Sequence, residues 1–531
     1  MFRILGLICL IVLVPSCDSV DPENYGKDYY SSSVLGLVNL LELERKFMEE
    51  FTVHADVMQE KVDNLQMYID YLDRAQHESH KEREKFVSNP LNAYGLIRRL
   101  QQDWPKWQNY TQKPLGTAQL NAMEELLSNA PDSYDMTESL KSMDRIEKTY
   151  DLPASHIARG LLQQKQYDTQ LPVRDCLALA QHKYETGDYI RASMWYREAL
   201  RHEPEPNAEL INAVLGDPRE GLDLQFARTM VIRGLGLSDQ SMSRETIHAS
   251  ASDFLNKSSP KDVEEFISYY LAQSDEEIAK EMGTPQTPPT AHDIGCRGLF
   301  PKRTNLVCRY NSTTTPFLKL APLKMEEVNH DPYIVMYHDV LSEREIEEMK
   351  QLAEPMVNGL SGSDMANISE PLEIVARVAW LVDPSPFRER LNIRIGDMTG
   401  FDVSDFEALQ LANFGVGSYF KAHYDYLTDR LTEGSSPLGD RTGSLIIYAS
   451  EVPQGGATIF PDIQVTVQPQ KGNSVFWYNT FDDSTPDPRS LHGVCPVIAG
   501  SRWTVTKWLH QWPQMFLKPC SPRRQLVERK S

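Results

Sequence analysis

Apolar residues recur at helical spacing along the first hundred positions of the chain. The steps of four and three run through Met58, Val62, Leu65, Ile69 and Leu72. This spacing predicts a helical region over residues 33–100, with a break at Ser88-Asn89-Pro90. The apolar stripe is either the seam of a helix hairpin or short coiled coil that joins two chains, or the buried face of an amphipathic helix within its own domain. The pattern supports both readings equally.

A helix–turn–helix pattern occupies residues 171–203. Gly187-Asp188 supplies the turn, and small alanines on both sides let the two helices approach closely. A single repeat of this tetratricopeptide-like kind cannot bury its own apolar face, so neighbouring helices must stack on it. The second copy expected within 205–250 is degenerate, and residues 222–237 are the candidate for its helix.

Aromatic residues within this pattern have two interpretations. They are Tyr184, Tyr189, Trp195 and Tyr196. Core packing suits Trp195 best. For the three tyrosines the functional interpretation is a groove of exposed rings, because extended proline-rich peptides bind in aromatic-lined grooves.

Short apolar runs replace the helical pattern toward the end of the chain. The expected strands are 334–337, 409–413, 444–448 and 474–478. Ser342 and Glu345 form a capping-box pattern, which predicts a helix over 342–349. A segment rich in proline and threonine, 283–290, has the composition of a linker. Residues 405–510 predict an antiparallel barrel-like or jelly-roll domain.

One constellation in this strand-rich part carries chemistry. His423 and Asp425 lie two apart on an expected strand and therefore point to the same face. With His492 from a later strand they form a two-histidine, one-carboxylate set, which binds Fe(II) and leaves positions open for a co-substrate and O₂. A turn at 499–501 places Arg502 on the next strand, where a guanidinium can clamp a carboxylate with two hydrogen bonds. The alternative is a set of satisfied polar residues in a strand-rich core.

Composition narrows the class of protein. A chain of 531 residues is too long for one core, so about two to four domains are expected. The formal net charge of −21 argues against binding to nucleic acid or to an anionic membrane surface, and suits basic partners. We expect no membrane span, because no stretch is long and apolar enough.

The first residues predict entry into an oxidising compartment. Residues 1–19 have the form of a secretory signal peptide, with Arg3 ahead of an apolar stretch. Among the five later cysteines, Cys296 with Cys308 and Cys495 with Cys520 are expected to form local disulfides, and Cys176 to stay free. Candidate glycosylation sites in that compartment are the sequons at Asn109, Asn256, Asn311 and Asn367.

Several runs together carry a family resemblance. The main ones are His423-Tyr424-Asp425, the Gly455–Pro461 and Gly472–Asn479 runs, His492-Gly493-Val494-Cys495-Pro496-Val497 and Lys507-Trp508-Leu509-His510. Upstream they are joined by Cys296-Arg297-Gly298, Cys308-Arg309-Tyr310 and Tyr337-His338-Asp339-Val340. These runs resemble the prolyl 4-hydroxylase alpha subunit, the collagen-modifying type. The resemblance is strongest over 331–512 and weakest over 205–290.

The resemblance implies a multidomain protein in three parts. These are an N-terminal helical dimerisation region, a tetratricopeptide-like helical peptide-binding domain, and a C-terminal double-stranded β-helix (jelly-roll) dioxygenase domain. The implied boundaries are a signal peptide at 1–19, a dimerisation domain at 20–145, a peptide-binding domain at 146–255, a linker with a disulfide loop at 256–330, and a catalytic domain at 331–531.

The implied reaction is 4-hydroxylation of proline in collagen-like X-Pro-Gly chains. It is coupled to oxidative decarboxylation of 2-oxoglutarate to succinate, with O₂ as the second co-substrate and ascorbate to keep the iron active. By resemblance, His423, Asp425 and His492 bind Fe(II). Arg502 pairs with the far carboxylate of 2-oxoglutarate, and His510 helps to position that co-substrate.

Two positions depart from the usual pattern of the family. Arg502 stands where a lysine is usual, and Phe414 stands where a tyrosine is usual. Phe414 cannot donate the hydrogen bond that a tyrosine offers the co-substrate, whereas arginine has donors to spare. We therefore expect the two changes to compensate each other.

The resemblance also implies an assembly and a location. The partner is protein disulfide isomerase, as the beta subunit of a heterotetramer with two alpha and two beta subunits in the endoplasmic reticulum lumen. The chain ends Val527-Glu528-Arg529-Lys530-Ser531, so we expect retention through that partner. Two other functions stay open: the same chemistry on a different secreted peptide, and a catalytically impaired homologue that only binds peptide. The intact metal set argues against the second.

Overall fold

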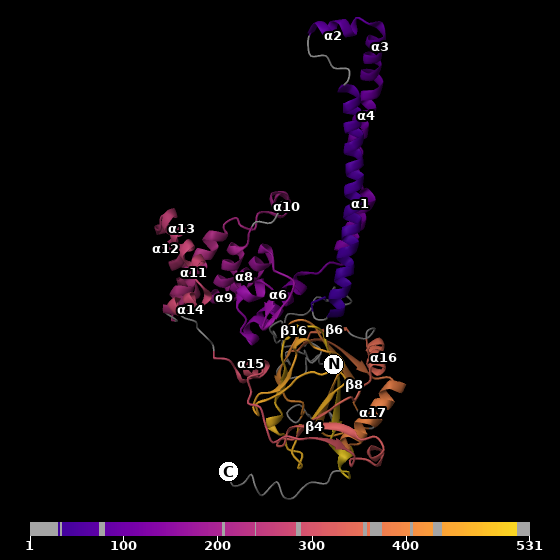
Figure 1. Cartoon of the computed structure of the whole chain (residues 1–531), viewed down its shortest axis with the longest axis vertical. Coiled ribbons are helices and arrows are strands. Elements are labelled where there is room, and N and C mark those ends of the chain that lie inside the picture. The colour runs from indigo at the N-terminus through magenta and orange to yellow at the C-terminus, as the bar shows by residue number, and fades with distance from the viewer. Residues whose placement is uncertain are drawn as a thin grey trace, which may run out of the picture.

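A helical part precedes a sheet-rich part in the computed structural model (Figure 1). The structure describes residues 30–31, 34–73, 80–203, 208–238, 241–282, 288–353, 358–361, 374–403, 407–427 and 438–517. The expected signal peptide, Asn367 and Cys520 lie outside these residues. Among the helices that are described, none carries an apolar run long enough to cross a bilayer.

A long helix, α1 (Val34–Asp73), dominates the N-terminal region. Four shorter helices follow it: α2 (His80–Val87), α3 (Pro90–Arg98), α4 (Trp104–Gln112) and α5 (Thr117–Leu127). The chain returns along α1, where the Tyr68 ring stacks on Trp107 with centroids 4.5 Å apart. Met58, Val62 and Ile69 of the apolar stripe are more than half exposed. The described residues therefore do not bury this stripe, and its role in dimerisation stays a prediction.

The next helices form a stacked layer, apart from α10, which lies outside it (Figure 1). They are α6 (Ser133–Tyr150), α7 (Ala154–Ala158), α8 (Val173–Thr186), α9 (Tyr189–Arg201), α10 (Ala208–Leu215), α11 (Leu222–Ser238), α12 (Arg244–Lys257), α13 (Pro260–Ala272) and α14 (Asp275–Met282). The turn between α8 and α9 uses Gly187 at φ +87° and Asp188 as the cap of α9, as the sequence predicted. α11 packs on α9, and α12 and α13 pack on α11. The layer thus continues to residue 282, into the segment that the sequence analysis assigned to a linker.

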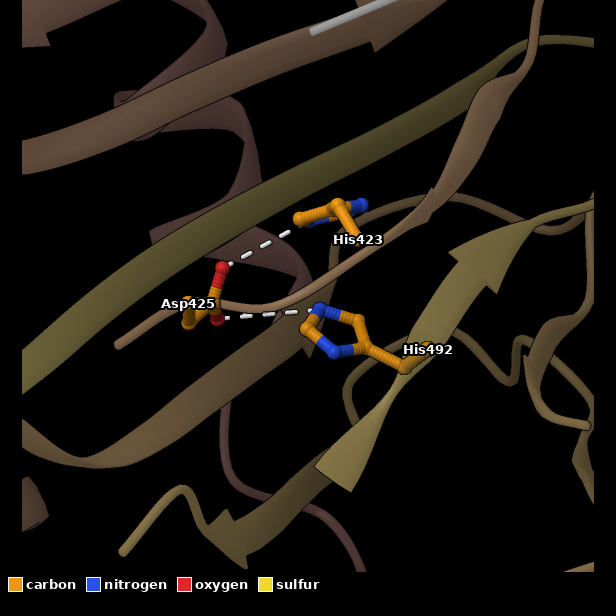
Figure 2. Close-up of side chains that lie close together, drawn as sticks. All are labelled: His423, Asp425 and His492. Carbon is orange, nitrogen blue, oxygen red and sulfur yellow. Dashed lines mark ion pairs between the residues drawn. The ribbon is translucent and has the colours of Figure 1, made fainter. Parts of the chain in front are cut away.

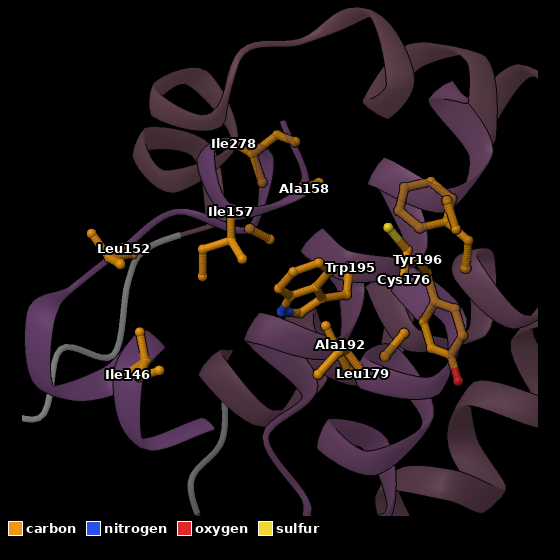
Figure 3. Packing of buried hydrophobic residues seen from close by; sticks show 14 of the residues in the cluster. Ile146, Leu152, Ile157, Ala158, Cys176, Leu179, Ala192, Trp195, Tyr196 and Ile278 are labelled. Atoms are coloured by element: carbon orange, nitrogen blue, oxygen red, sulfur yellow. The ribbon is translucent and has the colours of Figure 1, made fainter. Parts of the chain in front are cut away.

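Trp195 lies at the centre of this layer, fully buried among Ile146, Ile157 and Leu179 (Figure 3). Its indole N–H donates to the carboxylate of Glu147. Tyr196, predicted as an exposed groove residue, is only 1% exposed. That prediction is wrong, because its face of α9 is covered by α11, where Gln225 donates to the Tyr196 hydroxyl.

Two antiparallel sheets build the C-terminal part. The large sheet has the order β3-β4-β5-β14-β10-β17-β8-β7-β6, and the small sheet has the order β13-β12-β15-β9. The strands of the large sheet are β3 (Cys308–Asn311), β4 (Leu323–Asn329), β5 (Ile334–Tyr337), β6 (Asn358–Ser361), β7 (Val375–Leu381), β8 (Leu409–Phe414), β10 (Arg441–Tyr448), β14 (Ser474–Tyr478) and β17 (Arg502–His510). Those of the small sheet are β9 (Phe420–His423), β12 (Thr458–Phe460), β13 (Val465–Val467) and β15 (His492–Val494). A further short pair joins β11 (Gln454–Gly455) to β16 (Val497–Ala499).

Alternating side chains give the large sheet two apolar faces. One face packs Leu411, Leu445 and Val505 against the helices α16 (Glu343–Ala353) and α17 (Pro386–Thr399). Ser342 and Glu345 cap α16 as the sequence predicted. The opposite face meets the small sheet through residues such as Tyr448 and Phe460. The candidate metal ligands lie on this second, enclosed side.

The helical layer and the sheet-rich part share one core. Ile459 and Ile498 pack in the same buried cluster as Ile146. The Tyr150 hydroxyl donates to the carbonyl of Pro496 at 2.6 Å, and Arg145 donates to the carbonyl of Gly417. The two parts are therefore docked by apolar burial and by hydrogen bonds rather than joined by a linker alone.

The disulfide pairing predicted from the sequence is wrong. Cys296 bonds to Cys495, 199 residues later, and Cys308 is exposed with a free thiol. Cys296 ends α15 (Ala291–Cys296), which packs against β12, and Cys495 directly follows β15 beside the same strand. Cys308 instead starts β3 at the outer edge of the large sheet. Proximity in space, and not along the chain, sets the pairing.

Peptide mapping without reduction is expected to recover one cross-linked species that joins the peptides of Cys296 and Cys495. Replacing both residues by serine should lower the free energy of unfolding by about 2–5 kcal/mol, because the link closes a long loop. Cys308→Ser is the matched control and should leave stability unchanged. Recovery of a Cys296 peptide linked to Cys308 would contradict the observed pairing.

The sequons have different surroundings. Asn109 and Asn256 are exposed on helices. Asn311 is 8% exposed, and its amide group donates to the carbonyl of Met398 and accepts from Thr314. A glycan on that nitrogen has no room in the folded chain, so the prediction of glycosylation at Asn311 is wrong.

Candidate active site

The three predicted metal ligands meet on the small sheet (Figure 2). His423 ends β9, His492 begins β15, and the two residues lie opposite each other in the antiparallel register. Asp425 follows two residues after His423, and its carboxylate oxygens lie 3.5 Å from Nε2 of His423 and 3.6 Å from Nε2 of His492. All three side chains are buried, and their ligand atoms lie within 4.8 Å of one another. The sequence prediction of this cluster is therefore confirmed as a geometry.

Backbone carbonyls set the orientation of both imidazoles. Nδ1 of His423 donates to the carbonyl of Lys421 at 2.8 Å, and Nδ1 of His492 donates to that of Ser490 at 3.0 Å. With the proton held at Nδ1, each Nε2 carries a free lone pair that points at Asp425. This is the tautomer that a metal-binding histidine needs.

Hydrogen bonds from neighbouring strands fix the position of the Asp425 carboxylate. Ser444 donates to it at 2.6 Å, and Asn479 donates to the Ser444 hydroxyl at 2.8 Å. Burial works to raise the pKa of Asp425, but the electrostatic influence of His492, His423 and Arg441 outweighs it and lowers that pKa. Burial also lowers the pKa of His492, to about 4. Near neutral pH the cluster is thus one carboxylate with a neutral distal imidazole, which suits a divalent cation.

Aromatic rings pack against the ligands. The Phe420 ring stacks on His423 with centroids 3.7 Å apart, and the Trp477 ring meets the edge of His492 at 4.7 Å. Phe460 contacts both Trp477 and His492. These rings fix the imidazoles and keep water from their flanks.

Arg502 presents a buried cation close to the cluster. It is 1% exposed, and one guanidinium nitrogen donates to the Thr458 hydroxyl at 3.1 Å. Its Cζ lies 4.9 Å from the ring of Phe414 and 5.4 Å from that of Tyr448. Burial lowers the pKa of Arg502, and its Nε has no hydrogen-bond partner among the described residues.

A buried guanidinium nitrogen without a hydrogen-bond partner raises the free energy of the folded state unless an anion binds to it. The residues around Arg502 are aromatic or hydroxyl-bearing, so the described chain supplies hydroxyl contacts but no carboxylate there. The arrangement fits the carboxylate of an external ligand such as a dicarboxylic co-substrate, with Tyr448 and Thr458 as hydroxyl partners.

His510 does not join this group. It ends β17, eight residues from Arg502, which is about 25 Å along a strand. Both of its ring nitrogens are occupied, one by the carbonyl of Gly439 and one by the carboxylate of Glu407. The expectation that His510 positions the co-substrate is not supported, because its contacts tie it to the far end of the sheet.

Residues near that far end carry further charge and aromatic surface. Trp508 is paired with Ser444 in the register of β17 and β10 and so faces the same side as the metal ligands. The Arg441 guanidinium lies 3.9 Å over the Trp508 ring and forms an ion pair with Glu407. Trp380 of β7 is 5.8 Å from Trp508 and 37% exposed. Trp508 is buried and its ring is covered by Arg441, so among these residues Trp380 is the one that presents a partly exposed ring.

Tyr184 and Tyr189, the other predicted groove residues, are half-buried in the helical layer. Their rings lie 5.4 Å apart on either side of the turn between α8 and α9. Both contact His248 of α12, a residue that the sequence analysis did not single out. The metal cluster and the tyrosines occupy separate parts of the molecule.

Sequence reasoning also missed the residues that hold the ligands in place. Ser444 and Tyr448 stand on a strand that was expected, whereas Asn479 lies just after one and Thr458 stands on β12, which was not expected. The partners of all four depend on the register between strands. A polar residue inside an otherwise apolar strand, as Ser444 is in Ser444–Tyr448, was the available signal.

Comparisons with known proteins give matches to both the helical and the sheet-rich part of the chain. Residues 33–164 match the family model for the prolyl 4-hydroxylase alpha-subunit, N-terminal region, and residues 409–510 match the 2OG-Fe(II) oxygenase superfamily. The chain is 30% identical over 535 residues to prolyl 4-hydroxylase subunit alpha-1 of Bos taurus, with 94% of this chain and 97% of the bovine protein covered. The same figures hold for the Homo sapiens protein. A crystal structure of a viral collagen prolyl hydroxylase from Paramecium Bursaria Chlorella virus-1 shares 22% identity, covers 33% of this chain and 95% of its own, and has a TM-score of 0.26.

Proposed function

The chain belongs to the family of prolyl 4-hydroxylase alpha subunits and is a proline hydroxylase of the 2-oxoglutarate and Fe(II) type. On that premise, we propose that it hydroxylates C4 of proline in collagen-like X-Pro-Gly chains. The observation that carries the proposal is the cluster of His423, Asp425 and His492 together with the buried Arg502, whose Nε has no partner among the described residues. Collagen-like chains are the proposed substrate because the sequence runs resemble the collagen-modifying type of alpha subunit. The relatives that match nearly the whole chain are likewise prolyl 4-hydroxylase subunits.

In this proposal the metal ligands and Arg502 have separate roles. Nε2 of His423, Nε2 of His492 and the Asp425 carboxylate hold Fe(II) on one side. Bound Fe(II) supplies the activation of O₂ that is coupled to decarboxylation of 2-oxoglutarate to succinate. Arg502 binds the far carboxylate of 2-oxoglutarate and so orients its other end toward the metal ligands. Ascorbate is the proposed reductant that keeps the iron in the ferrous state.

The substrate chain meets aromatic surface at two places in this proposal. In the sheet-rich part, the partly exposed ring of Trp380 offers a flat surface to a proline-rich chain. In the helical layer, Tyr184 and Tyr189 offer a second aromatic surface. A chain in the polyproline II conformation is already extended and loses little entropy on such surfaces.

The finer architecture and assembly belong to the same proposal. The two facing sheets form a double-stranded β-helix, and the paired helices from α8 onward form a tetratricopeptide-like peptide-binding domain. The exposed apolar stripe of α1 supports dimerisation of two alpha subunits. Protein disulfide isomerase is the proposed beta subunit, in the endoplasmic reticulum lumen, where the disulfide between Cys296 and Cys495 can form.

Co-expression with protein disulfide isomerase, followed by mass spectrometry of a Pro-Pro-Gly repeat peptide after incubation with Fe(II), 2-oxoglutarate and ascorbate, tests the function. We expect oxygen to be added at the proline before glycine, and none with His423→Ala. Succinate formation without peptide oxidation would point to a different peptide substrate. An assembled complex that yields neither product would indicate a homologue that only binds peptide.

A further inference from the structure

Three side chains in the helical layer form a closed cluster. The rings of Tyr184 on α8, Tyr189 on α9 and His248 on α12 lie 5.4 to 5.5 Å apart and meet edge to face. The Tyr189 hydroxyl lies 2.7 Å from Nε2 of His248, and the Tyr184 hydroxyl lies 3.3 Å from Nδ1. One imidazole therefore bridges the hydroxyl groups of both tyrosines that we propose bind the substrate.

The cluster rests on apolar residues and keeps part of its surface open. Ile232, Ile247 and Ala251 form its buried floor, with Leu235 and Met242 packed beside them. Tyr184, Tyr189 and His248 are themselves only half-buried. A ligand can thus reach the rings while the floor holds them in place.

Charged residues on the neighbouring helices keep the imidazole neutral. Burial lowers the pKa of His248, and Arg244 on α12 and Arg228 on α11 lower it further, against the opposing effect of Glu245 on α12. A neutral imidazole has one N–H donor and one acceptor nitrogen. Its two tyrosine partners must therefore play opposite roles, one as a donor and the other as an acceptor.

Arg228 on α11 favours one of these two assignments. Burial raises the pKa of Tyr184, and the positive charge of Arg228 opposes that. Because this charge attracts the lone pairs of the Tyr184 oxygen, the Tyr184 O–H is directed away from it and donates to Nδ1 of His248. Nε2–H of His248 then donates to the Tyr189 oxygen, which leaves the Tyr189 O–H as a donor toward the open side.

A proline-rich chain needs such a donor. Proline has no backbone N–H, and the polyproline II conformation leaves the carbonyl groups without internal partners. Such a chain therefore offers acceptors and few donors, so a binding surface gains from donors whose direction is fixed in advance. A tyrosine hydroxyl that is free to rotate loses entropy when it binds a carbonyl, and this lowers the gain in binding free energy.

We propose that His248 is a positioning residue for the peptide substrate, which acts by turning the Tyr189 hydroxyl into a fixed hydrogen-bond donor to a carbonyl of the proline-rich chain. The proposal rests on the proposed function, in which the tyrosines of the helical layer bind substrate. Its chain of donors runs from Tyr184 through His248 to Tyr189.

The test compares KM, kcat and direct binding of a ten-repeat Pro-Pro-Gly peptide, with the full-length chain assembled with protein disulfide isomerase. His248→Phe keeps the ring and removes both hydrogen bonds, and should raise KM and the dissociation constant about three- to tenfold with kcat unchanged. Tyr189→Phe should do the same, and the double variant should be no weaker than either single variant. His248→Gln, which again offers a donor and an acceptor, should recover most of the affinity.

His182→Phe on α8 is the matched control, because it makes the same change in the same layer outside the cluster. It should leave KM unchanged, and thermal melting of every variant reports whether the layer still folds. Additive effects of His248→Phe and Tyr189→Phe, or an unchanged KM with His248→Phe alone, would overturn the role of His248. If Tyr184→Phe and Tyr189→Phe also leave peptide binding unchanged, the tyrosine surface itself is not the substrate site.

Discussion

Asp425→Asn is expected to abolish proline hydroxylation and to weaken binding of a divalent metal more than about a hundredfold. Changes to residues that merely support a ligand cost about 10- to 100-fold in metal affinity, and loss of a ligand charge should cost more. Asp425 is the sole carboxylate in the cluster of three, and both imidazole Nε2 atoms face it. Titration of the metal-free protein with Fe(II) or Co(II), followed by calorimetry, measures this without reference to turnover.

Two comparison variants sharpen this test. Asp462→Asn makes the same chemical change at an exposed carboxylate on the loop after β12 and should bind metal normally. Ser444→Ala removes the hydroxyl that holds Asp425 and should weaken metal binding by about 10- to 100-fold, between the two aspartate variants. Equal metal affinity for Asp425→Asn and Asp462→Asn would show that the cluster does not bind the metal.

The sequence sufficed for the metal ligands because strand periodicity alone fixes which side chains share a face. His423 and Asp425 were predicted from the alternation of a strand, although β9 ends at His423 and Asp425 lies just beyond it. The later strand of His492 was evident from its flanking turn. The strands at 334–337 and 474–478 and the capped start of α16 were likewise predicted from local patterns. The two strands and the cap depend on residues that are close along the chain, whereas His492 meets His423 through the pairing of β15 with β9.

Features that depend on packing between distant segments could not be predicted in this way. Cys296 and Cys495 approach each other only because α15 packs on the small sheet. Tyr196 is buried because α11 covers it, although its spacing equally suits an exposed position. His248 stands on a helix with no distinguishing motif, and its two tyrosine partners come from two other helices.

Arg502→Met should weaken 2-oxoglutarate binding by roughly 30- to 5,000-fold, because loss of one partner of a buried charge pair costs about 2–5 kcal/mol. Methionine keeps the length of the side chain and removes the charge that the carboxylate needs. The affinity for 2-oxoglutarate can be measured by calorimetry with Mn(II) in place of Fe(II), so that no turnover occurs. An unchanged affinity would place the co-substrate carboxylate elsewhere.

The pairing of Arg502 with Phe414 predicts a further, non-additive result. The guanidinium lies over the Phe414 ring and opposite it in the register of β17 and β8. Arg502→Lys alone should weaken 2-oxoglutarate binding about 10- to 150-fold, because lysine loses the planar fork and its stacking on the ring. Adding Phe414→Tyr should restore much of that loss, because the new hydroxyl can donate to the carboxylate oxygen that the fork no longer reaches.

In the Arg502 background, by contrast, Phe414→Tyr should give no gain, since a hydroxyl in this buried site competes with donors that are already in place. Phe401→Tyr, at a buried position on the opposite face of the large sheet, controls for the cost of burying a hydroxyl. A coupling between positions 502 and 414 of about 1 kcal/mol or more, measured as the departure from additivity, is the expected sign of compensation. Purely additive effects on 2-oxoglutarate affinity would mean that Arg502 and Phe414 do not compensate each other. In that case Tyr448 and Thr458 alone complete the carboxylate site beside Arg502.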